Sequence, residues 1–266
     1  KVIFHVHGRG AMAKLILLFI VLRVNFIYSP HGIHSASGAM RVLNDILHFL
    51  IAGFARHVIY VSESEKQNYF KKFRKPKKCS VILNGIEGPR NWSMKSKNGR
   101  KVVYVARFHY QKNINLFVEI AENNINYMFY IIGDGETKSE VENLIAKKNI
   151  NNIELLGYKQ NVLQELHKYD IYLSTSRWEG MPYSVIEALA SGLPCILSNV
   201  PGHDDIAKFG GNCISLFDCK SEIPLILDHL TKSYQERQAA SREVFEKKFT
   251  LSAMIEQYNT FYNSDD

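Results

Sequence analysis

The chain alternates between short apolar runs and longer mixed stretches over its first 85 or so residues. The apolar runs predict strands at residues 2–6, 24–29, 57–62 and 80–85. The stretches between them predict helices at residues 12–22, 38–52 and 63–73, with Ser62 and Glu65 spaced as a capping box for the third. Such alternation is typical of a parallel sheet with helices on its faces. We therefore predict an α/β domain over residues 1–88.

A polar stretch containing Pro and Gly follows at residues 89–100, and we interpret it as a hinge. A second α/β pattern then occupies residues 101–249, with strands expected near 101–108, 127–132, 153–158, 170–174, 195–200 and 210–217. Helices are expected near 114–123, before 148, and near 161–170, 182–191, 223–231 and 234–249, and Asn113 is the expected N-cap of the first. A last helix, capped by Thr250, is predicted to run to about Tyr262.

The segment TSRWEGMPYSVIEALASGLPCILSNV, at residues 175–200, predicts a loop, a helix and a buried strand. Pro182 suits the first position of the helix because its φ is already helical, and Gly192 with Pro194 ends it. Glu179 then lies in a loop at the carboxyl end of one strand, and Glu187 lies inside the helix.

Backbone amides of residues 180–184 separate these two carboxylates. The first amides of a helix attract anions, because their N–H groups are unpaired and the helix dipole is positive there. Carboxylates on either side accept hydroxyl groups. A ligand that carries both phosphate and sugar hydroxyls, such as a nucleotide sugar, fits this arrangement.

A pair of glutamates also has other interpretations. The two side chains could be solvated on a surface helix. A glycoside hydrolase uses two carboxyls roughly 5 to 9.5 Å apart. If the whole segment were one helix, the eight-residue spacing of Glu179 and Glu187 would separate them by about 12 Å, which favours a transferase.

The string EGMPYSVIEALASGLPCI resembles the signature of retaining glycosyltransferases of family 4. The resemblance covers essentially all the residues and is strongest from Val102 to Asp205. It implies an α/β chain of the GT-B fold, with two Rossmann-like domains of parallel sheets and the first domain incomplete at its start. It also implies that residues 101–249 bind the nucleotide sugar, and that residues 250–266 form a helix that packs back on the first domain.

The same resemblance implies a role for each matching residue. Glu187 would hold the ribose hydroxyls, Glu179 the donor sugar, and Arg107 and Lys112 the diphosphate, while His7 would lie close to the donor sugar. A weaker match is His31. Further donor contacts are implied for Gly180, Met181, Pro182, Tyr183, Ser184, Gly133, Gly157 and Tyr158.

The chemistry of the reaction supports the assignment of Arg107 and Lys112. A departing nucleoside diphosphate accumulates negative charge, which fixed cations can neutralise in place of a metal. The family uses no metal or other cofactor, and its favoured mechanism is a front-face substitution in which the leaving phosphate takes the acceptor proton. Without this context a strand-end Arg, a loop Lys or a strand-end His is usually a surface or structural residue. Gly133-Asp134-Gly135 lacks the third Gly of a dinucleotide fingerprint, and Asp134 has no carboxylate cluster around it for a metal.

Composition adds a preference for anionic partners. The 266 residues carry a formal net charge of +7 and are 46% hydrophobic. Basic residues crowd into KKFRKPKK, from Lys71 to Lys78, which suits a solvated helix end, a nucleic-acid patch or docking on an anionic membrane. On such a membrane each basic side chain adds about 1 kcal/mol.

Four cysteines without a CxxC motif indicate free thiols in a reducing compartment. The longest apolar run, residues 15–22, falls far short of the ~20 residues of a membrane span. The chain begins at Lys1 with a strand following at once, so we expect it to start inside a longer protein. The expected location is cytoplasmic, with association at the inner face of the membrane left open.

The predicted function is transfer of a sugar from a UDP-sugar to an acceptor hydroxyl with retention, in the synthesis of a cell-surface polysaccharide or glycolipid. The acceptor would be a glycan or a lipid-linked molecule. The alternatives are a fragment that binds a nucleotide sugar without turnover, a sugar-nucleotide epimerase of the same fold, and a basic nucleic-acid-binding protein. The last rests on charge alone, and no nucleic-acid partner is expected.

Overall fold

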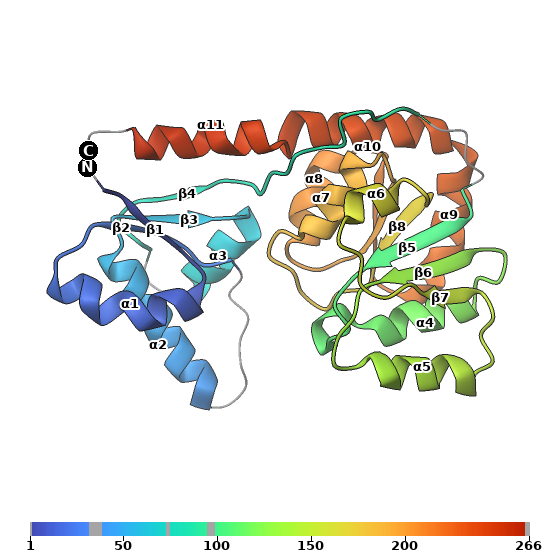
Figure 1. Ribbon diagram of the computed structural model, residues 1–266, viewed down its shortest axis with the longest axis horizontal. Helices are drawn as coiled ribbons and strands as arrows, with labels where there is room; N and C mark the ends of the chain where they lie inside the picture. Colours follow the sequence, from blue (N-terminus) through green and yellow to red (C-terminus); the bar gives the residue numbers. More distant parts are fainter. Residues whose placement is uncertain (1, 32–38, 73–74, 95–98, 264–266) are drawn as a thin grey trace. The chain divides into compact units, whose positions relative to one another are not determined.

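A computed structural model describes residues 2–31, 39–72, 75–94 and 99–263 of the chain (Figure 1). Its contacts divide the chain into two compact units. Unit 1 comprises Lys1–Asn84 and Ser252–Asp266, and unit 2 comprises Gly85–Leu251. The last helix therefore belongs to unit 1 from Ser252 onward.

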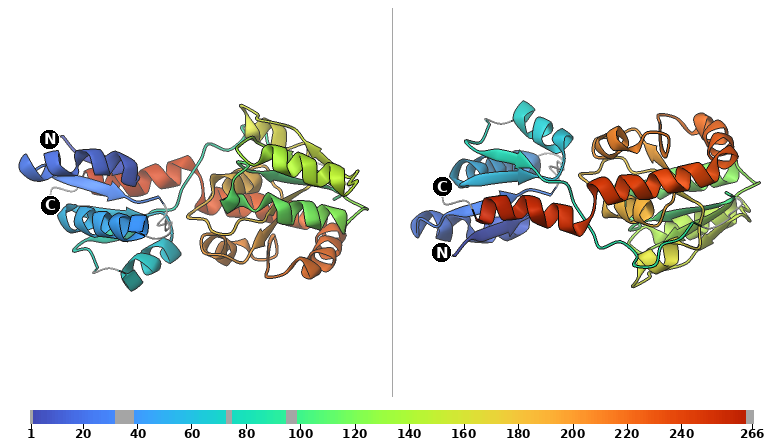
Figure 2. Two further views of the ribbon diagram at one scale, coloured as in Figure 1. Left: turned by 90° about the horizontal axis from the view of Figure 1, so that it is seen from below. Right: turned by 90° about the horizontal axis from the view of Figure 1, so that it is seen from above.

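Unit 1 contains a four-stranded parallel sheet in the order β1-β2-β3-β4. Its strands are β1 (Phe4–His7), β2 (Phe26–Ser29), β3 (His57–Tyr60) and β4 (Cys79–Val81). The helices are α1 (Arg9–Val21), α2 (Ala39–Phe54), α3 (Glu63–Lys72) and α11 (Leu251–Tyr262). Figures 1 and 2 show α1, α2 and α3 on one face of this sheet and α11 on the other.

Both faces of the unit 1 sheet are covered, which explains why every residue of β2 is buried. Successive side chains of a strand point to opposite faces. In β2, Phe26 and Tyr28 join the core beneath α1 and α2, whereas Ile27 between them joins Tyr258 and Phe261 of α11. The alternation of β2 thus fixes where α11 packs.

The start of α3 follows the capping box only in part. Ser62 Oγ accepts a hydrogen bond from the Glu65 amide at 3.1 Å, as predicted. The Glu65 carboxylate accepts from the amide of Val61 at 2.9 Å. The carboxylate therefore holds the end of β3 as well as the start of the helix.

Unit 2 contains a six-stranded parallel sheet in the order β10-β9-β8-β5-β6-β7. The strands are β5 (Lys101–Val105), β6 (Met128–Ile132), β7 (Ile153–Leu155), β8 (Ile171–Ser174), β9 (Cys195–Ser198) and β10 (Ile214–Phe217). The chain builds outward from β5 to β7 and then returns to place β8 on the other side of β5. The strand order therefore reverses between β5 and β8.

Helices cover both faces of the unit 2 sheet, with α4 and α5 on one face and α6, α7 and α8 on the other (Figure 1). They are α4 (Ile114–Glu122), α5 (Lys138–Lys147), α6 (Val162–Leu166), α7 (Tyr183–Ala190), α8 (His203–Gly210), α9 (Ile223–Lys232) and α10 (Tyr234–Lys248). Short 3₁₀ turns, η1 (Tyr110–Lys112) and η2 (Lys220–Glu222), complete the unit.

The structure differs from the sequence expectations at three places. The expected hinge at residues 89–100 differs from the division of the chain, which falls after Asn84. Trp92 packs within unit 2, with Arg242 over its ring at 5.5 Å. Helix α7 begins one residue later than expected, so Pro182 is its N-cap with ψ 119° and not its first helical residue. Helix α8 was not predicted at all.

A substitution of Gly133 tests how closely the chain after β6 approaches the chain after β5. Its φ is +145°, and a Cβ there would overlap the carbonyl oxygen of Ala106. We expect Gly133→Ala to cost about 3 kcal/mol or more, because backbone strain and overlap add. Gly157 has φ +68° with open space around it, so Gly157→Ala should cost only about 1–2 kcal/mol. Urea unfolding measures both, and equal costs would contradict the close approach of the two strands.

Candidate functional site

The reversal of strand order in unit 2 determines where its polar loops meet. In open parallel sheets, ligands bind outside the carboxyl ends of the strands at such a reversal. The loop after β5 carries Arg107 and Lys112, and the loop after β8 carries Glu179. Because β5 and β8 are neighbours, the topology brings these two loops together.

Lys112 and Glu179 form an ion pair at this edge. Lys112 Nζ lies 2.5 Å from Glu179 Oε1, and the two side chains are only 18% and 7% exposed. Ser176 Oγ donates to Glu179 Oε1 at 2.6 Å, and Gln111 Nε2 donates to Oε2 at 3.4 Å. We call these four side chains the strand-end site. Both oxygens of the Glu179 carboxylate are thus fixed in direction.

Buried hydroxyls hold the Lys112 backbone in place. Tyr104 OH and Thr175 Oγ1 both donate to the Lys112 carbonyl, at 3.0 and 3.1 Å. Tyr104 OH also lies 2.8 Å from Ser176 Oγ, which places β5 against the strand-end site. Burial raises the pKa of Tyr104 above its usual range, so the phenol stays protonated and can donate.

Asn113, predicted to cap α4 with its side chain, instead binds the loop after β8. It is the N-cap of α4 by position, but its φ is +50° and its side chain makes no capping hydrogen bond. Its Oδ1 accepts from Arg177 Nη2 at 2.8 Å, while the Arg177 guanidinium lies 4.4 Å from the Tyr110 ring. The Arg177 amide also donates to the Gln111 carbonyl at 2.8 Å. The loop after β8 therefore clamps the loop after β5.

Arg107 lies just after β5, with its side chain exposed. Within the described part of the chain its guanidinium has no ion pair or hydrogen bond. It precedes Lys112 on the same loop but does not join the strand-end site. Its five donors are therefore available to an anion at this edge.

Glu187 lies in the middle of α7, mostly buried, and no described side chain hydrogen-bonds to it. Burial raises the pKa of its carboxyl from an ordinary 4.5 to about 7. At the start of the same helix, Tyr172 OH donates to Ser184 Oγ at 2.8 Å. The amides of Tyr183 and Ser184 belong to the first turn, whose N–H groups have no carbonyl partner inside the helix.

The remaining predicted donor contacts divide into two groups. Gly133 and Gly157 end the neighbouring strands β6 and β7, where the Gly133 amide donates to the Gly157 carbonyl at 2.9 Å. Tyr158 follows them and is 75% exposed. In the loop before α7, Met181 and Pro182 are buried, whereas Gly180 is partly exposed and Tyr183 is 49% exposed.

Sequence reasoning missed a buried histidine behind the strand-end site. His203 begins α8 and is fully buried, with Nδ1 hydrogen-bonded to the Ser198 carbonyl at 2.9 Å. Its Nε2 has no hydrogen-bond partner among the described residues. Burial lowers its pKa to about 4, and the charges of Glu179 and Lys112 act on it. The available sequence signal is the segment PGHDDI, which follows directly after the strand predicted at residues 195–200.

Gly202 brings that histidine close to the strand-end site. Its φ is +89°, and a Cβ there would lie 2.6 Å from the Gly180 carbonyl and 2.8 Å from that of Glu179. The Glu179 amide donates to the Pro201 carbonyl at 3.3 Å. The loop before α8 therefore supports the Glu179 loop from behind. Asp205, on the same helix, is buried and pairs with Lys208 at 3.0 Å.

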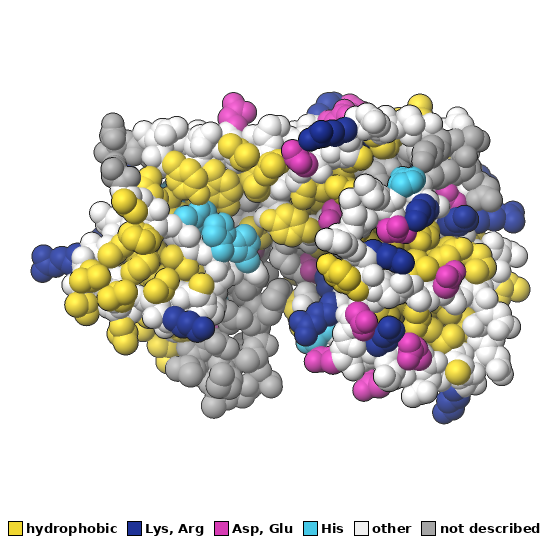
Figure 3. Space-filling view, in the orientation of Figure 1, with side chains coloured by type: hydrophobic (Ala, Val, Ile, Leu, Met, Phe, Trp, Pro, Cys, Tyr) yellow, Lys and Arg dark blue, Asp and Glu magenta, His cyan; other side chains and the backbone are white. Residues whose placement is uncertain are grey.

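Unit 1 carries a histidine cluster at the carboxyl ends of β1 and β2, visible as a cyan patch in Figure 3. His7 Nδ1 and His31 Nε2 are 2.6 Å apart, and the rings of His5 and His7 are 4.1 Å apart. His5 also hydrogen-bonds to Ser29 and to Tyr262 of α11, at 2.9 and 2.7 Å. Burial lowers the pKa of all three imidazoles, that of His5 to about 4.

Other side-chain chemistry is sparse. Among the described residues no group of three or more His, Cys, Asp or Glu could hold a metal ion. Asp134 accepts a hydrogen bond from the Gly135 amide and lies 3.5 Å from Lys138, a contact that uses its carboxylate within the chain. All four cysteines, each of them described, are free thiols. Among the helices of the described residues, none combines the length and the hydrophobicity of a membrane-spanning segment.

Comparison with known proteins decides the family. Residues 90–244 match the family described as Glycosyl transferases group 1, and residues 2–87 match Glycosyltransferase Family 4. The chain belongs to the glycosyl transferases group 1 family. The strand-end site and α7 lie in the part of the chain that matches Glycosyl transferases group 1. The histidine cluster lies in the part that matches Glycosyltransferase Family 4.

Two Escherichia coli relatives are similar to this family member. One is a UDP-Gal:alpha-D-GlcNAc-diphosphoundecaprenol alpha-1,3-galactosyltransferase, 34% identical over 56% of this chain and 44% of the relative. The chain thus spans less than half the length of that enzyme. The other is the O-antigen biosynthesis glycosyltransferase WclY, 24% identical over 98% of this chain and 79% of the relative.

A solved structure confirms the predicted fold class. The Anabaena protein Alr3699/HepE, in complex with UDP and glucose, matches with a TM-score of 0.85. It is 16% identical, and the match covers 98% of this chain and 77% of that one. Both units of the present chain are α/β with parallel sheets, as the GT-B fold requires.

The raised pKa of Glu187 makes stability depend on pH with a definite sign. The folded state favours the neutral carboxyl, so the cost of ionising it is absent below about pH 4.5 and complete above about pH 7. We expect Glu187→Gln to raise Tm by a few degrees at pH 8 and to leave it unchanged at pH 4.5.

Thermal melting of the ligand-free protein from pH 4.5 to 8 measures this difference. Glu142→Gln, at an exposed position of α5, is the matched control and should not reproduce it. A Tm difference for Glu187→Gln that is constant with pH would contradict a buried, hard-to-ionise carboxyl.

Proposed function

We propose that the chain belongs to a retaining glycosyltransferase that transfers a sugar from a UDP-sugar to an acceptor hydroxyl. The observation that best supports this proposal is the Lys112–Glu179 ion pair, which lies where the strand order reverses and beside the start of α7. Its relatives include a galactosyltransferase that uses UDP-Gal and an O-antigen biosynthesis glycosyltransferase. We therefore propose a role in the synthesis of a cell-surface polysaccharide or glycolipid.

In this proposal the diphosphate binds between Lys112 and the first turn of α7. The amides of Tyr183 and Ser184 and the helix dipole favour an anion there. Lys112 has three N–H donors, so it can keep its bond to Glu179 and still donate to a phosphate oxygen. Arg107, unpaired among the described residues, supplies a second cation. No metal or other cofactor is required by this scheme.

Glu179 would hold the transferred sugar. Hydrogen bonds from Lys112, Ser176 and Gln111 fix its carboxylate, and Oε2, which accepts only from Gln111, retains acceptor capacity for a sugar hydroxyl. Glu187 would accept the two ribose hydroxyls. Because those hydroxyls hydrogen-bond to the ionised carboxylate, donor binding should shift Glu187 toward its charged form.

The proposed chemistry is a front-face substitution. The acceptor oxygen bonds to the anomeric carbon on the face from which the bond to the leaving phosphate breaks, and the acceptor proton passes to that phosphate. No side chain needs to act as a nucleophile. Lys112 and Arg107 stabilise the departing diphosphate, which is where negative charge develops.

His7 would position the reacting sugar. Its lowered pKa keeps the imidazole neutral at pH 7, and His31 hydrogen-bonds to its Nδ1. The other ring nitrogen, Nε2, can then exchange a hydrogen bond with a sugar hydroxyl. For the acceptor we propose a glycan or a lipid-linked molecule, with the basic segment Lys71–Lys78 adding attraction to an anionic membrane surface. No nucleic-acid partner is proposed.

Lys112→Met tests the assignment of the diphosphate site. It removes the cation and leaves Glu179 buried without its partner, so kcat/KM should fall by at least about a hundredfold. Lys147→Met, at an exposed position of α5, is the matched control and should retain activity. Radiolabelled sugar transfer from a panel of UDP-sugars measures both, and full transfer by Lys112→Met would remove the residue from the mechanism.

UDP titration separates an enzyme from a fragment that only binds. Calorimetry should show UDP binding that Lys112→Met weakens and Lys147→Met does not. Binding without turnover on any glycan acceptor would favour the binding-only alternative. Absence of UDP binding by the wild-type chain would sink the proposal.

His7→Gln should lower kcat by about tenfold or more while leaving UDP affinity unchanged, because the proposed contact is to the sugar. His167→Gln, at an exposed position of unit 2, serves as the control. Steady-state kinetics and UDP titration together distinguish the two effects. A loss of UDP affinity equal to the loss of kcat would contradict the sugar contact.

A further inference from the structure

A pocket lies at the amino end of the unit 1 sheet. The strands are parallel, so the residues that precede them gather at one edge, opposite the edge where His7 and His31 lie. The pocket has a volume of about 360 Å³. Its lining residues are Val2, Ile3, Asn25, Phe26, Ile27, Arg56, His57, Lys78, Thr260 and Phe261.

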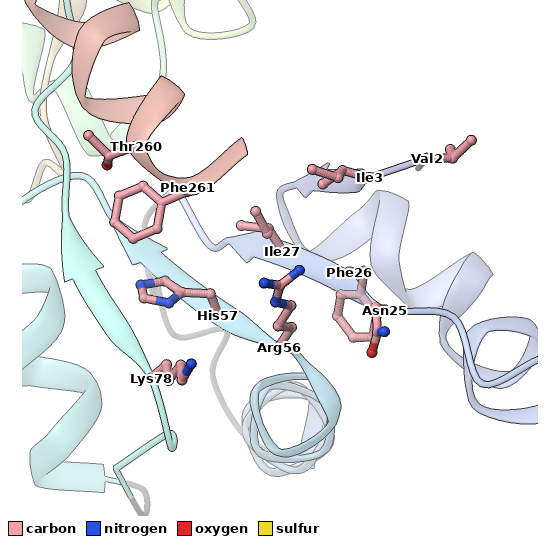
Figure 4. Close-up of a pocket in the computed structure, with 10 residues that line it drawn as sticks. All are labelled: Val2, Ile3, Asn25, Phe26, Ile27, Arg56, His57, Lys78, Thr260 and Phe261. Atoms are coloured by element: carbon pink, nitrogen blue, oxygen red, sulfur yellow. The ribbon is translucent and has the colours of Figure 1, made fainter. Parts of the chain in front are cut away.

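Figure 4 shows how the pocket is built. The Arg56 side chain extends into it toward Ile27 and Ile3, with His57 and Phe261 on one side and Asn25 and Phe26 on the other. Apolar side chains therefore form much of the wall around one guanidinium.

The backbone fixes the charged residues of this pocket. The Arg56 amide donates to the Phe26 carbonyl at 2.9 Å, and the Val58 amide donates to the Lys78 carbonyl at 3.0 Å. His57 Nε2 hydrogen-bonds to Ser80 Oγ at 3.0 Å, and its ring lies 4.6 Å from that of Phe261. Arg56 and Lys78 thus start neighbouring strands of a packed sheet.

Positive charge in the pocket is not compensated by the described residues. Its lining contains no Asp or Glu. No described acidic side chain forms an ion pair with Arg56 or Lys78. Burial lowers the pKa of His57, and the charges of Lys78 and Arg56 lower it further, which reports a positive field inside the pocket.

The surface around the pocket is apolar and basic. Val2, Leu22 and Phe54 are 78%, 62% and 54% exposed, and each lies just before a strand of this sheet. Arg23 and Lys77 are exposed in the same connections. Figure 3 shows hydrophobic side chains gathered over the face of unit 1 that α1 occupies, with basic side chains at its margin.

We propose that this pocket binds the phosphate of an anionic lipid headgroup, so that the amino edge of the unit 1 sheet docks on an anionic bilayer. Arg56 is suited to bidentate binding of a phosphate, and Lys78 adds a second cation. Val2, Leu22 and Phe54 would enter the interfacial region of the bilayer, where exposed apolar side chains are stabilised. The site is separate from the proposed donor site and does not depend on glycosyl transfer.

Vesicle flotation of the full chain tests this proposal. The probes are phosphatidylcholine vesicles with and without about 30 mol% phosphatidylglycerol, where each basic contact is worth about fivefold in partitioning. The double variant Arg56→Gln/Lys78→Gln should bind the anionic vesicles about thirtyfold more weakly than wild type. The matched variant Lys147→Gln/Lys168→Gln removes the same charge from exposed positions of unit 2, outside the pocket, and should lose at most about fivefold.

Thermal melting of both double variants establishes that they fold as the wild type does. Equal losses for the two variants would show diffuse attraction by basic surface and overturn the pocket. Calorimetric titration with inorganic phosphate distinguishes the source of the ligand. Phosphate binding at the pocket without any preference of the wild type for anionic vesicles would overturn the lipid assignment.

Discussion

The ion pair between Lys112 and Glu179 depends on one feature of the fold, the reversal of strand order between β5 and β8. Because β5 and β8 are neighbouring strands, the loops that follow them meet at the sheet edge. Once the two charges are mostly buried, each requires the other, because a lone buried charge is strongly destabilising. The hydroxyl groups of Tyr104, Thr175 and Ser176 hydrogen-bond to Lys112 and Glu179 and so hold both loops in the position where the two charges pair.

Much of the fold could be predicted because its signals are local. The short apolar runs predicted the strands of both sheets. The helical stretches between these runs predicted that the strands pair in parallel. Helix α8 was missed because its start depends on Gly202, whose positive φ is imposed by contact with the Glu179 loop. The placement of Trp92 in unit 2 likewise depends on a distant partner, Arg242, that no local pattern reveals.

The site was predictable as a set of strand ends but not as a set of contacts. Position along the chain placed Lys112 and Glu179 at the same edge, and the family resemblance assigned them to different parts of a donor. Their direct pairing depends on side-chain packing. The same holds for Glu187, whose pKa is raised by burial within the fold, and for His203, which no sequence pattern marked as buried beside the site.

The clamp formed by Arg177 has an evolutionary consequence. Its guanidinium bonds to Asn113 and covers Tyr110, so two loops separated by more than sixty positions along the chain behave as one rigid piece. A substitution in either loop that alters its course strains the other. Changes in selectivity that arise here should therefore be strongly epistatic, with acceptable variants of one loop requiring a compensating variant of the other.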